Sequence, residues 1–106
     1  LSSTMWRFDK NWKGLRREVP WVDRLPSEIL HEHLRLSLQH VDGPDDPAQL
    51  LQSIGHLGSE DMLLFSTDYP HWQAQRPEDI APAGLPEPLR AKILATNATA
   101  TYGRLR

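Results

Sequence analysis

The chain has 106 residues, with 12 basic and 14 acidic side chains that give a formal net charge of −2, and it contains no cysteine. One domain at most fits in this length, and the balanced charge excludes the strongly basic surface that nucleic-acid binding requires. The lack of cysteine excludes disulfides, zinc ribbons and a thiol nucleophile, and no apolar run approaches the ~20 residues of a membrane-spanning helix.

The N-terminal part of the chain predicts two helices followed by a strand. Between residues 4 and 19 apolar side chains recur at steps of three and four, which is typical of an amphipathic helix, and Pro20 ends it. A second, short helix is expected from Ser27 to His33, with Ser27 as its cap. Residues 34–39 alternate apolar and polar side chains, as a strand does, although a helical period is also compatible there.

The C-terminal part predicts a helix, a buried strand and a final helix. A loop rich in Asp, Gly and Pro spans residues 40–47, and a helix follows over residues 47–57. Residues 62–65 form an apolar run of the length of a buried strand, and residues 89–102 predict the last helix. Two strands joined through a helix by short connections form a βαβ unit with parallel strands. The predicted fold class is therefore α/β, helix-rich, with about two parallel strands.

The stretch that follows the second strand, Ser66-Thr67-Asp68-Tyr69-Pro70-His71, carries the most chemistry. Ligands and catalytic groups lie at the C-terminal ends of parallel strands, so Asp68 is a candidate metal ligand or general base. The alternative is that Asp68 caps the turn through its own backbone, and spacing alone favours that alternative. His71 is a candidate ligand, acid or pocket wall, whereas the simpler interpretation is a loop histidine bonded to a backbone carbonyl.

The other histidines are weaker candidates. His40 follows the first strand and falls at the same rim as Asp68 if the strands are parallel, so it is a candidate pocket residue. His31 and His33 are two residues apart in a predicted helix, where their side chains point away from each other, so a metal pair is not expected. His56 lies between apolar positions of the next helix, and a structural role is expected for it.

Several stretches together resemble the C-terminal part of the amidohydrolase-related family, whose metal-dependent (β/α)8-barrel hydrolases also include decarboxylases such as the aminocarboxymuconate-semialdehyde decarboxylase type. The resemblance runs over nearly the whole chain, and Leu64-Phe65-Ser66-Thr67-Asp68-Tyr69-Pro70-His71 is its most specific stretch. Supporting stretches are Met5-Trp6-Arg7-Phe8-Asp9-Lys10-Asn11-Trp12, Glu18-Val19-Pro20-Trp21, Pro26-Ser27-Glu28, the strand ending at Gln39, Lys92-Ile93-Leu94 and Asn97-Ala98.

The resemblance implies that residues 1–106 are the C-terminal part of a single TIM (β/α)8 barrel domain, with the seventh and eighth strands. It implies that Asp68 contacts a catalytic divalent metal, with zinc as the expected ion, and that His71, His40 and Tyr69 are possible pocket residues. The family's His-x-His pair and two further histidines belong to earlier strands. Because a catalytic metal takes three or more protein ligands, the fragment alone is expected to be inactive.

The implied function is a hydrolase in which metal-activated water attacks a C–N or C–O bond of a small-molecule substrate. Two alternatives stay open, a non-oxidative decarboxylase of the same family and a non-catalytic interaction module made from a barrel remnant. The expected partners are the remaining N-terminal part of the barrel and, because two strands leave exposed edges, further copies of the chain. No nucleic-acid or membrane partner is expected, and the absence of cysteine fits a cytoplasmic protein.

Overall fold

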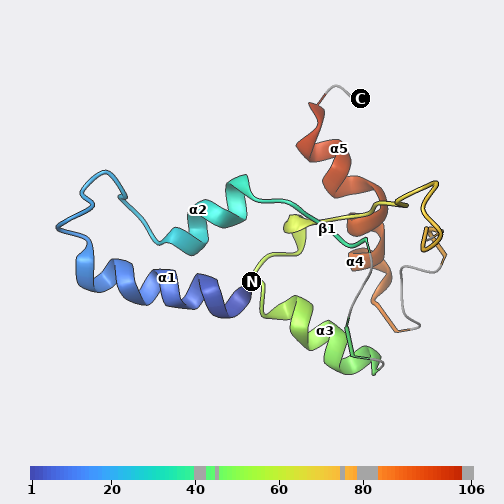
Figure 1. Cartoon of the computed structure of the whole chain (residues 1–106), viewed down its shortest axis with the longest axis horizontal. Helices are drawn as coiled ribbons and strands as arrows, with labels where there is room; N and C mark the ends of the chain where they lie inside the picture. The colour runs from blue at the N-terminus through green and yellow to red at the C-terminus, as the bar shows by residue number, and fades with distance from the viewer. Residues whose placement is uncertain (40–42, 45, 75, 79–83, 104–106) are drawn as a thin grey trace.

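The structure is a computed structural model that describes residues 1–39, 43–44, 46–74, 76–78 and 84–103. In chain order it contains α1 (Ser2–Leu15), α2 (Pro26–His33), β1 (Leu36–Ser37), α3 (Pro47–Gly55), the 3-10 turn η1 (Glu60–Met62), β2 (Leu63–Leu64), α4 (Glu87–Ala91), the π turn η2 (Lys92–Thr96) and α5 (Asn97–Thr101). The last three run on from one another as a single C-terminal helix (Figure 1). Among the helices of the described residues, none is long and apolar enough to cross a bilayer.

The two strands form a parallel pair, with Leu36 opposite Leu63 and Ser37 opposite Leu64. Because α3 lies between them in the chain, the predicted βαβ unit is confirmed. Each strand is only two residues long, much shorter than the predicted ranges 34–39 and 62–65. A strand extends only where a neighbour bonds to it. Among the described residues the pair gains one further bond, from the Leu38 N–H to the Leu64 carbonyl at 2.8 Å.

Helix boundaries differ from the predicted ones where local bonds intervene. The first helix ends at Leu15 rather than at residue 19, because the Glu18 N–H bonds the Leu15 carbonyl at 2.8 Å in a tighter turn. The second helix has nearly its predicted range, but Ser27 is not its cap. Leu25 is the N-cap residue, and the Ser27 N–H donates at 2.9 Å to Oδ1 of Asp9 on α1.

The core lies between the strand pair, α3 and the C-terminal helix. Its buried side chains are Leu50, Ile54, Leu63, Leu89 and Ile93. The pair α1 and α2 packs together on the other side of the strands from α4 and α5 (Figure 1). The N-terminal helices therefore contribute little to the buried cluster that supports β2.

The chain is more open than its length predicts. Its radius of gyration is 16.0 Å, whereas a compact domain of this length has about 13 Å. Its accessible surface is 7631 Å², whereas a compact monomer of this mass exposes about 6,000 Å². Two of the tryptophans are largely exposed, Trp21 by 76% and Trp72 by 84%. Much apolar surface is thus left without a partner inside the described residues.

Candidate functional site

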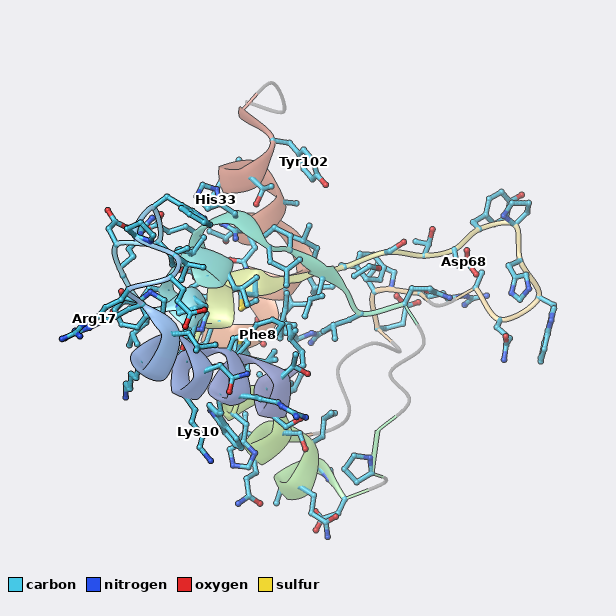
Figure 2. All side chains as sticks on the ribbon, turned by 60° about the vertical axis from the view of Figure 1, so that its left-hand side comes forward. Phe8, Lys10, Arg17, His33, Asp68 and Tyr102 are labelled. Carbon is cyan, nitrogen blue, oxygen red and sulfur yellow. The ribbon has the colours of Figure 1, made fainter. Side chains whose placement is uncertain are left out.

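Asp68 lies beyond the carboxyl end of β2, in a loop that extends away from the helices (Figure 2). Its side chain is 46% exposed. Its backbone has φ of 54°, in the left-handed region that aspartate tolerates better than most residues do. The Tyr69–Pro70 peptide that follows is cis. Asp68 therefore lies in the loop that follows β2, four residues after Leu64, the last residue of that strand.

The turn after β2 is capped by Thr67 and not by Asp68. The Thr67 hydroxyl accepts the Tyr69 N–H at 3.3 Å, and the Asp68 backbone carbonyl accepts the His71 N–H at 2.8 Å. The Asp68 carboxylate instead faces the imidazole of His71, with Oδ2 3.5 Å from Nδ1. Spacing alone favoured Asp68 as the cap of this turn, but the cap is Thr67. The Asp68 carboxylate does not make the capping bond and instead contacts His71.

His71 is a neighbour of Asp68 and has two contacts at the same ring nitrogen. Its Nδ1 lies 3.5 Å from Oδ2 of Asp68 and 3.4 Å from the Gln73 N–H, which donates to it. The same ring nitrogen therefore lies between the Asp68 carboxylate and the backbone that follows the turn.

A hollow of about 430 Å³ lies beside this turn. It is lined by Thr67, Tyr69, Ala74, Arg76 and Pro77. Tyr69 is one of the lining residues, and its side chain is 83% exposed. Of the other two possible pocket residues, His71 is not among the described lining of this hollow, and His40 lies outside the residues that the structure describes. The hollow is large enough for a small molecule, and its described lining includes both chain neighbours of Asp68 but not Asp68 itself.

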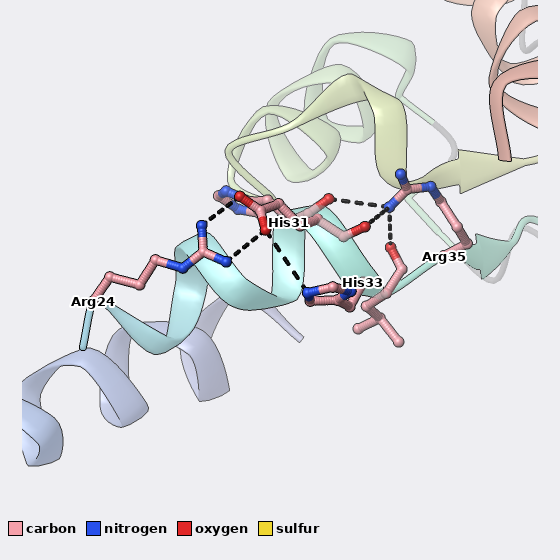
Figure 3. A network of polar contacts seen from close by, with 6 residues as sticks. Arg24, His31, His33 and Arg35 are labelled. Carbon is pink, nitrogen blue, oxygen red and sulfur yellow. Dashed lines mark hydrogen bonds and ion pairs between the residues drawn. The ribbon is translucent and has the colours of Figure 1, made fainter. Parts of the chain in front are cut away.

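His31 and His33 point in different directions, as predicted for this helix (Figure 3). The Nε2 atom of His31 lies 2.8 Å from the Leu57 carbonyl, and the ring packs against Gly58. Gly58 has φ of 74°, and a Cβ there would lie 3.2 Å from Cε1 of His31. The side chain of His33 is 71% exposed. His31 therefore ties α2 to the end of α3, and the two histidines do not form a metal pair.

A polar network surrounds the same helix (Figure 3). The two terminal nitrogens of Arg24, Nη1 and Nη2, donate to the Glu32 carboxylate at 2.5 and 2.6 Å. This double hydrogen bond, with the opposite charge, lowers the pKa of Glu32 and raises the pKa of Arg24. Nη1 of Arg35 donates at 3.0 Å to the His31 carbonyl, in the last turn of α2. These contacts hold α2 in place and lie away from Asp68.

The C-terminal helix carries a buried polar residue that the sequence analysis missed. Asn97 is 4% exposed, and its side-chain amide donates to the carbonyls of Glu60 at 2.8 Å and Leu63 at 2.9 Å. A signal for it exists in the sequence, because Asn97 follows Leu89 and Ile93 at steps of four on the apolar face. A polar residue on an apolar stripe indicates a specific buried hydrogen bond.

The described residues do not make a metal centre by themselves. Within the part of the chain that the structure describes, no group of three or more His, Cys, Asp or Glu side chains comes together. Catalytic zinc takes three protein ligands and keeps one open position. Asp68 with His71 beside it is an incomplete set, so the predicted metal site is not formed by these residues alone.

A family model described as amidohydrolase matches residues 3–104. The matched region contains both strands, the Asp68 turn and all of the C-terminal helix. The search of curated proteins finds no match.

Proposed function

The chain belongs to the amidohydrolase family, and from this we propose a hydrolase in which Asp68 helps a water molecule to attack a C–N or C–O bond. The observation that carries the proposal is the position of Asp68, in the loop that follows the carboxyl end of one of two parallel strands. Catalytic groups of barrel enzymes lie at that end. A hollow large enough for a small-molecule substrate is lined in part by Thr67 and Tyr69, the two chain neighbours of Asp68.

The placement of the chain within a barrel is part of the proposal. The family suggests a (β/α)8 barrel, and a helix-rich chain with two parallel strands is compatible with part of one. We propose that residues 1–106 form the C-terminal part, with β1 and β2 as the seventh and eighth strands. The open shape of the chain supports this placement, because the neighbouring strands would cover surface that is exposed here.

Metal dependence is a further part of the proposal. Members of the amidohydrolase superfamily typically bind divalent metals, and such an ion supplies the Lewis acidity that makes hydrolysis possible at neutral pH. Asp68 is proposed as an oxygen ligand, a general base or both, and zinc as the ion. Its partners in binding would come from strands outside the described residues, since the described residues offer no complete ligand set.

The chemistry proposed for Asp68 is a proton transfer. Its carboxylate takes a proton from the water whose oxygen attacks the carbonyl carbon, and it passes that proton to the nitrogen or oxygen that leaves. His71 contacts Oδ2 at 3.5 Å and restrains the orientation of the carboxylate. Thr67 supplies the turn that keeps Asp68 free for this role.

A decarboxylase of the aminocarboxymuconate-semialdehyde type is the alternative within the family. It would use the same strand end on a carboxylic acid, and release of CO₂ rather than of an amine or alcohol would distinguish it. A non-catalytic interaction module is the other candidate. It is favoured by an apolar groove of about 230 Å³, lined by Phe8, Asn11, Trp12, Leu15, Val19, Val22 and Pro26.

The test is the activity of the full-length protein on a panel of small amides, esters and carboxylic acids. Asp68→Asn keeps the shape and removes the base, so kcat/KM should fall by about 100-fold or more, the range for general-base catalysis. Asp61→Asn is the matched control, because Asp61 lies before β2 and its carboxylate bonds Lys92 at 3.0 Å. Equal rates for Asp68→Asn and the wild type would rule out the catalytic role.

A further inference from the structure

Another hollow, of about 200 Å³, lies at the opposite end of the strand pair from Asp68. Its lining includes Arg35, Asp61, Lys92 and Thr101. Arg35 directly precedes β1, and Asp61 lies in η1, which leads into β2, so the hollow borders the amino ends of both strands. Asp68 follows the carboxyl end of β2. The hollow is therefore separate from the candidate active site.

The guanidinium of Arg35 is held at this hollow by uncharged acceptors. Its Nη1 atom donates to three carbonyls at the end of α2, those of His31 at 3.0 Å, Glu32 at 3.3 Å and Leu34 at 2.9 Å (Figure 3). Its Nε atom donates to the Thr101 hydroxyl at 3.1 Å. A guanidinium in a protein keeps its charge. These four bonds therefore fix the position of a cation without neutralising it.

Arg35 and Thr101 both have hydrogen-bond donors left over. Nη2 of Arg35 carries two N–H groups, and no acceptor for them lies among the described residues. The Thr101 oxygen accepts from Nε of Arg35, so its own O–H still has a proton to donate. Since both residues line the hollow, one group placed there can accept from both of them.

The other charged side chains at the hollow are paired with one another. Nζ of Lys92 lies 3.0 Å from Oδ1 of Asp61 and 3.1 Å from Oε2 of Glu60. Hydrogen bonds to these two carboxylates raise the pKa of Lys92, so the ammonium stays charged beside them. Arg35 has no carboxylate partner within the part of the chain that the structure describes. Its charge is the one left for a ligand of opposite sign.

We propose that this hollow binds a small oxyanion, a carboxylate or a phosphate, through Arg35 and Thr101. Charged oxygen acceptors are the natural partners of guanidinium and hydroxyl donors. Because Nη1 and Nε are already bonded, the anion contacts Arg35 through Nη2 alone and not through a two-bond fork. A dissociation constant on the order of 1 mM is therefore expected. The proposal does not depend on the catalytic one, because it uses neither Asp68 nor a metal.

The experiment follows the Nε–H signal of Arg35 by NMR in the full-length protein with isotope-labelled arginine. The signal is identified by its loss in Arg35→Lys, and by its displacement in Thr101→Val, which removes the hydroxyl bonded to Nε. Sodium phosphate and sodium acetate are titrated separately, and sodium chloride at the same ionic strength measures screening alone. Thr99→Val is the matched control for Thr101→Val, because the Thr99 hydroxyl bonds the Ala95 carbonyl within the helix at 3.0 Å.

The Arg35 signal should shift with phosphate, with acetate or with both, and the shift should saturate with a midpoint on the order of 1 mM. Thr101→Val should raise that midpoint about fivefold, as loss of one hydrogen bond does. Thr99→Val should match the wild type, and so should Asp68→Asn, which separates this site from anions bound at the candidate active site. The site is overturned if neither anion shifts the signal more than chloride does, or if Thr101→Val leaves the midpoint unchanged.

Discussion

Whether Asp68 has a structural or a chemical role depends on its neighbour Thr67, whose hydroxyl accepts the hydrogen bond that caps the turn. Aspartate and threonine can both cap a turn. The sequence therefore identified Asp68 as a candidate site residue, but it could not show whether the Asp68 carboxylate accepts the capping hydrogen bond. The choice depends on φ and side-chain rotamers, and the structure assigns the cap to Thr67. Asn tolerates the left-handed φ of 54° as aspartate does, so Asp68→Asn removes charge while keeping the turn.

The two histidines of α2 predict different effects on stability. His31→Ala leaves the Leu57 carbonyl without its partner, which should lower the free energy of unfolding by about 1–3 kcal/mol. His33→Ala changes an exposed side chain and should alter stability by no more than about 0.5 kcal/mol. Urea denaturation of both variants checks this. Similar stability for the two variants would contradict the structural role of His31.

The pair of Arg24 and Glu32 predicts a dependence of stability on acid. Hydrogen bonding to Arg24 lowers the pKa of Glu32 from its ordinary value of 4.5, so the folded state prefers the carboxylate. The stabilisation is therefore complete above pH 4.5 and is lost as the pH falls through the lowered pKa. Thermal unfolding from pH 7 to pH 3 should show a shallower loss for Glu32→Gln and for Arg24→Gln than for the wild type. If the unfolding temperature of all three proteins fell equally with pH, the Arg24–Glu32 pair would not be the source of the acid dependence.

The secondary-structure elements were predicted well where a short local signal defines them. Pro26 and Pro47 each open a helix at the first turn, and Gly58, with φ of 74°, follows α3. The strands were predicted too long, because strand length depends on neighbours that the local sequence does not specify. The π turn was not predicted, and the Ile93 carbonyl within it accepts the Phe65 N–H, a contact between residues far apart in the sequence.

The first turn of α2 is capped by a side chain of α1. Because Leu25 offers no side-chain oxygen, the Ser27 N–H depends on Asp9. Asp9→Ala should cost about 0.5–2 kcal/mol, as loss of a helix cap does, and should increase hydrogen exchange in the first turn of α2. Glu18→Ala, at an exposed position, is the control. Unchanged exchange in α2 of Asp9→Ala would show that the helix does not need this bond.

The chain as a whole leaves large hydrophobic side chains exposed to solvent. Its radius of gyration is 16.0 Å, and the side chains of Trp21 and Trp72 are exposed. The described residues therefore leave apolar side chains outside the core. The sequence predicted this from two strands that cannot close a barrel. It predicted two open edges, whereas the edge of β2 is covered by Asn97 and Ile93. The ligands that would join Asp68 could not be predicted here, because a metal site combines residues from several strands.

The central claim is that Asp68 belongs to the metal site of an amidohydrolase barrel, and metal analysis of the full-length protein tests it most directly. The wild type and Asp61→Asn should each retain about one divalent ion per chain after extensive dialysis, as catalytic sites with three protein ligands do. Asp68→Asn, folded to the same extent by circular dichroism, should retain much less. Full metal content in Asp68→Asn, or a wild type that holds no divalent metal, would contradict the account.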